Sequence, residues 1–168
     1  ADIDATISCL RVLHAHILDK PDSLAIFPIQ KTPATPVLDC GESGTTLRLL
    51  MPVAAALYER VGFTGRGRLP ERPVSELLAC ISAHGVTADN AHLPLTLTGK
   101  LRFGTYEIAG DISSQYVSSL LFALPLLDGD SDIRLLSPLQ SEGYVSMTLA
   151  VLARFGIRAE LTQQGYFI

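Results

Sequence analysis

The distribution of apolar residues divides the chain into two kinds of predicted helix. Three segments, near residues 3–14, 73–84 and 143–155, place apolar side chains at helical spacing on one face and end near a glycine or a polar break. Two others, starting near Ser43 and Ser113, are apolar nearly all round, which is typical of buried helices. The pattern therefore predicts three exposed helices and two buried ones.

Short segments with alternating or β-branched residues lie between these helices. They are bounded by Gly, Pro, Asp or Ser, as strands commonly are. The segments are SLAIFPI, VGFTG, LPLTLTG, TYEIAG, SDIRLLS and RAELT, and the final GYFI also fits a strand.

The predicted elements repeat with a period of about 70 residues, and Thr45 matches Ser114 between the two buried helices. Each repeat combines an exposed helix, strands and a buried helix, which indicates a layered α/β fold with parallel buried helices surrounded by sheets. About two and a half repeats are present, so we expect an incomplete circle. No Gly/Ser-rich or charged linker interrupts the pattern, and residues 1–168 are expected to form one domain.

Composition narrows the classes of partner. The net charge is −4 and no basic run occurs, which argues against nucleic acid. No apolar run reaches membrane-spanning length and no signal peptide opens the chain, so we expect a soluble, cytoplasmic protein without a membrane partner. The cysteines are predicted to be buried free thiols, the histidines surface or loop residues, and no metal site is expected: Cys9, Cys40, Cys80, His14, His16, His84 and His92.

The starts of the two buried helices carry more polar groups than a simple cap requires. CGESGTT supplies glycines and two threonines, and DISSQ supplies two serines and the amide of Gln115. Helix N-termini attract anions because their first N–H groups are unpaired and the helix dipole is positive there. Ordinary capping by Ser43 and Ser113 is the alternative, and the sequence leaves both interpretations open.

Arginines add to the anion-binding hypothesis. The loop GRGRLPERP contains Arg66, Arg68 and Arg72, and Arg72 lies in a short, stiff turn before Pro73. Arg48, one turn into the first buried helix, is a further candidate, although pairing with a core carboxylate is the interpretation we favour for it. Together these features predict a site for a small polyanion.

Five segments together closely resemble the 3-phosphoshikimate 1-carboxyvinyltransferase family over essentially the whole chain: DIDATISCLRVL, DCGESGTTLRLL, GRLPERP, DISSQYVSSLL and SEGYVSMTLAVLARFG. The resemblance implies two similar domains, each an inside-out α/β barrel of three βαβαββ subdomains. It also implies transfer of the enolpyruvyl group of phosphoenolpyruvate to the 5-hydroxyl of shikimate 3-phosphate, in aromatic amino-acid biosynthesis, without a metal or an organic cofactor.

The resemblance also implies which residues bind the two substrates, and it assigns no catalytic residue to this chain. Those expected to bind shikimate 3-phosphate are Ser113, Ser114, Gln115, Thr45, Ser141 and Tyr144. Those expected to bind phosphoenolpyruvate are Gly44, Arg72, Gln115 and Arg68.

The chain departs from the family pattern in three respects. Glu42 replaces a common asparagine, and Glu142 and Gly143 replace a lysine–proline pair before Tyr144. An early lysine–serine and arginine segment and a second domain with further acidic and basic residues are absent, so the chain is expected to be inactive alone. The alternatives are a UDP-N-acetylglucosamine carboxyvinyltransferase-like enzyme with the same fold, and a non-catalytic anion-binding or structural domain.

Overall fold

The computed structural model of the protein describes residues 2–29 and 35–168. Its α-helices confirm the predicted positions of all three exposed and both buried helices. They are α1 (Asp2–Val12), α2 (Gly44–Leu57), α3 (Ser75–Ser82), α4 (Ser114–Ala123) and α5 (Glu142–Arg154), with 3-10 turns η1 (Leu69–Glu71) and η2 (Leu124–Leu126).

The strands form one hairpin and two four-stranded sheets. The hairpin joins β1 (His16–Lys20) to β2 (Ser23–Phe27). The first sheet has the order β3-β4-β6-β5, from β3 (Val37–Asp39), β4 (Arg60–Thr64), β5 (Thr87–Ala88) and β6 (Leu95–Thr98). The second has the order β7-β8-β10-β9, from β7 (Thr105–Ile108), β8 (Asp132–Leu135), β9 (Glu160–Leu161) and β10 (Gly165–Phe167).

Each predicted strand segment contains an observed strand, but β1, β3 and β5 were not predicted. The strands β3 and β5 have three and two residues, too few to show an alternation. In β1 only Ile17 is buried, so its sequence carries little of the two-residue period that marks a half-buried strand.

The two sheets belong to two copies of one βαβαββ unit. In each unit a parallel strand pair is joined by a buried helix, β3–α2–β4 and β7–α4–β8, and an outer helix then leads to an antiparallel strand pair. Three outer helices end at left-handed residues about 70 positions apart, His14, Gly85 and Gly156. The described strands do not close into a barrel.

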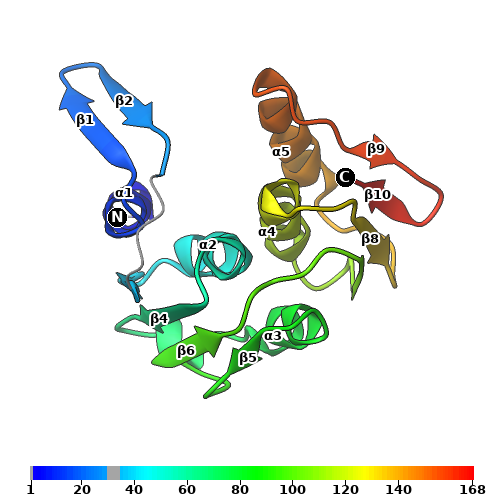
Figure 1. Ribbon diagram of the computed structural model, residues 1–168, viewed down its shortest axis with the longest axis horizontal. Coiled ribbons are helices and arrows are strands. Elements are labelled where there is room, and N and C mark those ends of the chain that lie inside the picture. Colours follow the sequence, from blue (N-terminus) through cyan, green and yellow to red (C-terminus); the bar gives the residue numbers. More distant parts are fainter. Residues whose placement is uncertain (1, 30–34) are drawn as a thin grey trace.

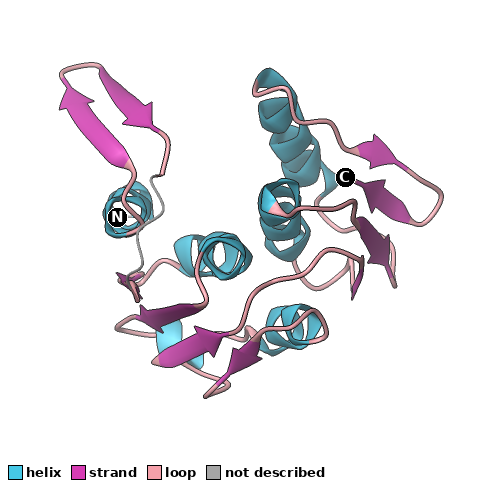
Figure 2. Ribbon diagram, viewed as in Figure 1, coloured by secondary structure: helices cyan, strands magenta, loops and turns pink. Residues whose placement is uncertain are grey.

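The buried helices α2 and α4 pack side by side at the centre, with the sheets and outer helices around them (Figures 1 and 2). Leu47 and Met51 on α2, and Val117, Leu120 and Leu121 on α4, are almost completely buried. Because the starts of both helices touch and η2, after α4, contacts α2, the two helices run parallel. This arrangement confirms the prediction of buried parallel helices.

Two of the outer helices pack in the same way, each against the first strand of the next unit. Helix α1 packs on β3, and α3 packs on β7. Among the described residues no strand covers the corresponding side of α5. Large apolar side chains are exposed there at helical spacing: Tyr144, Met147, Val151 and Phe155. This face of α5 is where a further unit of the repeat would pack.

We expect Leu120→Ala to lower the free energy of unfolding by roughly 2–5 kcal/mol, because it opens a cavity in the core against which α4 packs. Leu126→Ala is the matched control, since Leu126 is 46% exposed whereas Leu120 is 0% exposed. Urea unfolding of both variants checks this. Equal losses for the two would contradict the central position of α4.

Candidate functional site

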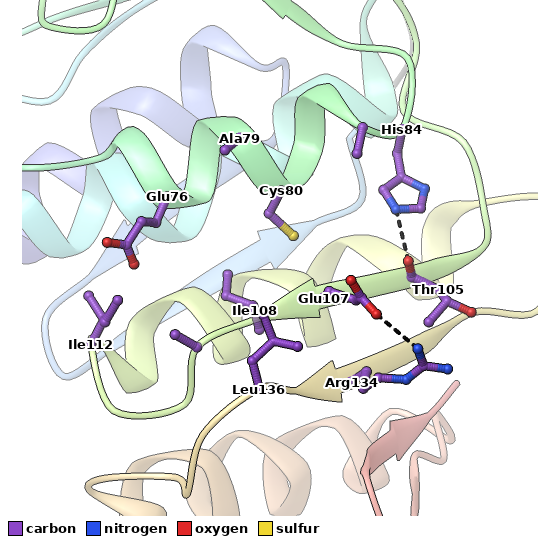
Figure 3. Close-up of a pocket in the computed structure, with 12 residues that line it drawn as sticks. Glu76, Ala79, Cys80, His84, Thr105, Glu107, Ile108, Ile112, Arg134 and Leu136 are labelled. Atoms are coloured by element: carbon purple, nitrogen blue, oxygen red, sulfur yellow. Dashed lines mark hydrogen bonds and ion pairs between the residues drawn. The ribbon is translucent and has the colours of Figure 1, made fainter.

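A groove of about 680 Å³ lies between α3 and strands β7 and β8 (Figure 3). Two pairs of its polar groups are already in contact with each other. Arg134 pairs with Glu107 at 2.8 Å, and Nε2 of His84 lies 3.1 Å from the Thr105 carbonyl oxygen. Burial raises the pKa of the Cys80 thiol to about 12, so it is not a ready nucleophile. Of the charged side chains that line the groove, Arg134 and Glu107 neutralise each other, which leaves the Glu76 carboxylate among mostly apolar neighbours.

His84 lies in the turn that follows α3, which agrees with the predicted surface or loop position. Its ring is half-buried and stacks on Tyr106 with centroids 3.7 Å apart and an interplanar angle of 13°. Burial lowers the pKa of His84, and the contact with the Thr105 carbonyl opposes this shift. The histidine is thus part of the packing of α3 on the second sheet.

The candidate site is a smaller cavity of about 280 Å³ at the starts of α4 and α5. It brings together residues of α2 and α4 and of the segments before α4 and α5, including four that the sequence predicted as ligands. The lining residues are Arg48, Asp111, Ile112, Ser113, Ser114, Gln115, Gln140 and Ser141. Unpaired N–H groups and a positive helix end make such a position suitable for an anion.

Both buried helices have conventional serine caps. The Ser43 hydroxyl accepts from the Thr46 N–H at 3.1 Å, and the Ser113 hydroxyl accepts from the Gln115 N–H at 3.3 Å. Capping is therefore a confirmed role of these two serines. Because the caps are equivalent, Thr45 matches Gln115, and the predicted match of Thr45 with Ser114 was wrong by one residue.

These equivalent residues meet across the two helices. Nε2 of Gln115 donates to the Thr45 hydroxyl at 3.1 Å. The starts of α2 and α4 therefore open on the same side, as the repeat predicted.

Arg48 has surroundings that the sequence did not predict. Its Nη1 donates to Gln115 Oε1 at 3.0 Å, and its Nη2 donates to the Pro73 carbonyl at 3.4 Å. Its guanidinium carbon lies 5.8 Å from the centre of the Tyr116 ring. Arg48 forms no ion pair with any described carboxylate, so the favoured interpretation of a core ion pair was wrong.

Arg72 lies on the rim at the start of α2. A Cβ atom at Gly44 would come 2.9 Å from Arg72 Nη1, so the glycine leaves the space that this guanidinium occupies. Arg66 turns instead toward Asp39, with 3.7 Å between Nη1 and Oδ2. The exposed Arg68 precedes η1 and does not line the cavity.

Ser141 and Tyr144 both lie at the start of α5, but only Ser141 lines the cavity. Ser141 adopts a left-handed conformation with φ of 58°. Tyr144 is 66% exposed. The structure thus brings Ser141 to the site and leaves Tyr144 on the adjoining surface.

Glu42, the acidic departure from the family pattern, lies outside this cavity. Its carboxylate is close to Gly67, and it lines a different cavity together with Arg66. Its negative charge therefore does not occupy the space between the starts of α4 and α5.

Sequence reasoning missed several groups of the site. Asp111 and Ile112 adjoin the serines in sequence, and Gln140 adjoins Ser141, so neighbourhood alone could have indicated them. The carboxylate of Asp111 accepts a hydrogen bond from Ser137. The Pro73 carbonyl, which also accepts from the Tyr116 hydroxyl at 2.9 Å, has no sequence signal.

Metal and membrane features are absent from the part of the chain that the structure describes. No group of three or more acidic, histidine or cysteine side chains is arranged to hold a metal there. None of the described helices has the length and apolar character needed to cross a membrane. The thiols of Cys9, Cys40 and Cys80 are free and buried, as predicted.

Comparison with known proteins agrees with the motifs and the fold. The sequence model of the EPSP synthase (3-phosphoshikimate 1-carboxyvinyltransferase) family matches residues 1–168. The chain belongs to this family. It is 40% identical over 174 residues to the 3-phosphoshikimate 1-carboxyvinyltransferase of Clostridium kluyveri, covering 99% of this chain and 40% of that protein.

Further relatives extend this result. The 3-phosphoshikimate 1-carboxyvinyltransferase of Methanocorpusculum labreanum is 36% identical over 175 residues, covering 99% of this chain and 41% of that protein. An EPSP synthase structure from Acinetobacter baumannii superposes with a TM-score of 0.79 at 21% identity, covering 98% of this chain and 38% of that one, which supports the fold. The chain thus spans about two fifths of the length of these relatives.

The lowered pKa of His84 predicts a pH dependence of stability. The folded state favours the neutral imidazole, so the unfolded state binds the proton more readily once the pH falls through about 6.5. As the pH falls from about 6.5 to the folded pKa of His84, we expect the free energy of unfolding to decrease. His84→Gln should make the free energy of unfolding depend less on pH in this range. Urea unfolding at several pH values measures it, and an NMR titration midpoint of His84 above 6.5 would be incompatible with this account.

Proposed function

We propose that this chain is the substrate-binding part of an enzyme that transfers enolpyruvyl from phosphoenolpyruvate to the 5-hydroxyl of shikimate 3-phosphate, with release of phosphate. The observation that carries this proposal is the meeting of the starts of α2 and α4 through Gln115 and Thr45. Family membership supports the reaction, and the geometry supports a site for anions.

The charges at this site favour a ligand with phosphate groups. Two parallel helices present their positive ends on one side, and Arg48 and Arg72 contribute guanidinium groups there. The hydroxyls of Ser113, Ser114 and Ser141 and the amide of Gln115 adjoin the same space. A phosphorylated cyclic polyol combines the anion and the hydroxyls that such a set can bind, so we assign these four residues to shikimate 3-phosphate.

Phosphoenolpyruvate is assigned to the adjacent rim. Gly44 leaves room for the Arg72 guanidinium over the start of α2, where backbone N–H groups can also bind a carboxylate or phosphate. Thr45 and Gln115 lie between this rim and the cavity. Tyr144 and Arg68 are weaker members of the assignment, because both are exposed and neither lines the cavity. Arg72 does not line the cavity either, but its guanidinium lies against the start of α2.

Among the described residues that line the cavity, none is a free acid or base for the reaction. Transfer requires one proton delivered to the methylene carbon of phosphoenolpyruvate and one removed from the 5-hydroxyl of the acceptor. The lining carboxylate, Asp111, is already bonded to Ser137. We therefore assign proton transfer to a second domain, since the longer relatives have room for one. We assign to the same domain the further basic side chains that would bind the substrates. We propose no metal or organic cofactor. The buried free thiols suit a reducing cytoplasm.

We expect the 168-residue chain to release no phosphate above background when it is given both substrates. Preorganised groups on both sides of a reacting centre supply most of the transition-state stabilisation, and this chain supplies one side. A phosphate-release assay, with a full-length relative as positive control, measures this. An ordinary enzymatic rate from the chain alone would contradict the assignment of the acid and base to another segment.

Binding of substrate distinguishes the proposed function from a general anion-binding domain. Gln115→Ala should weaken shikimate 3-phosphate binding by about tenfold or more, because it removes a hydrogen bond to a charged group. Titration calorimetry with shikimate 3-phosphate, shikimate and inorganic phosphate gives the comparison. If inorganic phosphate binds as well as shikimate 3-phosphate, the chain recognises only the anion and the general anion-binding alternative holds.

A further inference from the structure

Arg48 connects three segments at the candidate site. It belongs to α2, donates to Gln115 on α4, and donates to the Pro73 carbonyl in the loop before α3. It is half-buried, and no described carboxylate neutralises it. A cation removed from water without a counter-charge is costly, so its retention in this position indicates a specific use.

The chemistry of the guanidinium fixes the orientation of the neighbouring amide. Arginine has five N–H donors and no acceptor, so the Gln115 atom that faces Arg48 must be the carbonyl oxygen Oε1. The amide nitrogen Nε2 then faces the Thr45 hydroxyl, which accepts one of its two hydrogens. A flipped amide would place two donors against each other at 3.0 Å.

We propose that Arg48 is a positioning residue, which holds the Gln115 amide so that its second N–H remains a hydrogen-bond donor for the anionic substrate. The identity of that substrate rests on the proposed function, whereas the positioning itself does not. Gln115 unsupported by Arg48 would present either its oxygen or its nitrogen to the ligand. An anion is repelled by the first and bound by the second.

The same arginine places the loop that carries Arg72. The Pro73 carbonyl accepts hydrogen bonds from both Arg48 and the Tyr116 hydroxyl, and Arg72 precedes it in the chain. Arg48 thereby relates the position of Gln115, which lies between the two proposed ligand positions, to that of Arg72, which is assigned to phosphoenolpyruvate.

Direct binding of the ligand by Arg48 is the competing role, and the geometry favours positioning. Nη1 and Nη2 are already bonded to protein atoms, and Nε is buried without a partner. Two of the five guanidinium N–H groups are therefore engaged with the protein before any ligand arrives, and direct binding would have to use the second N–H of Nη1 or Nη2.

The first test needs no ligand. In the ¹⁵N-labelled chain, Arg48→Met should shift the two side-chain N–H resonances of Gln115 and speed their exchange with water by about tenfold or more, the loss expected for a hydrogen bond to a charged group. Arg60→Met, at an exposed arginine of β4, is the control and should leave them unchanged. Unchanged Gln115 resonances in folded Arg48→Met would overturn the proposal.

The second test uses shikimate 3-phosphate on the wild-type chain, Arg48→Met, Arg48→Lys and Gln115→Glu. We expect about tenfold weaker binding for Arg48→Met and partial rescue by Arg48→Lys, which retains a donor toward Oε1 but lacks the planar fork. Gln115→Glu should lose binding although it keeps the contact with Arg48, because it replaces the donor with an acceptor. If Arg48→Met does not fold, Arg48→Lys carries both measurements.

The two tests separate the proposed function from the positioning role of Arg48. A wild-type chain that does not bind shikimate 3-phosphate contradicts the proposed function, and the ligand-free resonances still decide the role of Arg48. Wild-type affinity in Arg48→Met overturns the positioning role, and so does lost affinity with unchanged Gln115 resonances, which would show direct binding.

Discussion

The parallel packing of α2 and α4 is the constraint on which the rest of the structure depends. Both helices are apolar nearly all round, so each must be buried, and each serves as the crossover between two parallel strands. Parallel packing places two positive helix ends together, which is unfavourable without a compensating charge. Burial of the apolar surface outweighs this repulsion, and a bound anion would relieve it. The packing that stabilises the domain thus also creates the site.

Polar groups inside this core are satisfied locally. The Ser119 hydroxyl donates to the Tyr116 carbonyl at 2.7 Å, and the hydroxyls of Ser118 and Thr148 lie 2.9 Å apart between α4 and α5. These partners lie within the helix or on its neighbour, so the serines of α4 beyond its first turn are structural. The hydroxyls that face a cavity are those of the first turn, before the helix enters the core. The serine-rich stretch therefore has two roles that change with position along one helix.

Periodicity predicted the helices because each is long enough to show which side faces the core. Most strands were indicated by alternating or β-branched segments between turn residues. Periodicity could not predict β3, whose parallel partner β4 lies beyond α2, or β5, which has only two residues. The family motifs indicated Ser113, Ser114, Gln115 and Ser141, which share a cavity, but they did not indicate that Tyr144 lies outside it. Arg48 shows most clearly what could not be predicted from the sequence alone. An arginine on an apolar helix gives no information about its partner until α4 and the Pro73 loop are placed against it.

The central claim is that the starts of α2 and α4 form one anion site. It is tested most directly by following the backbone amide resonances of the chain during titration with shikimate 3-phosphate. The account predicts that the amides of Gly44, Thr45, Ser114 and Gln115 shift together, with one common half-saturation concentration. Shifts confined to the groove between α3 and β7, or separate half-saturation concentrations for the two helix starts, would contradict it.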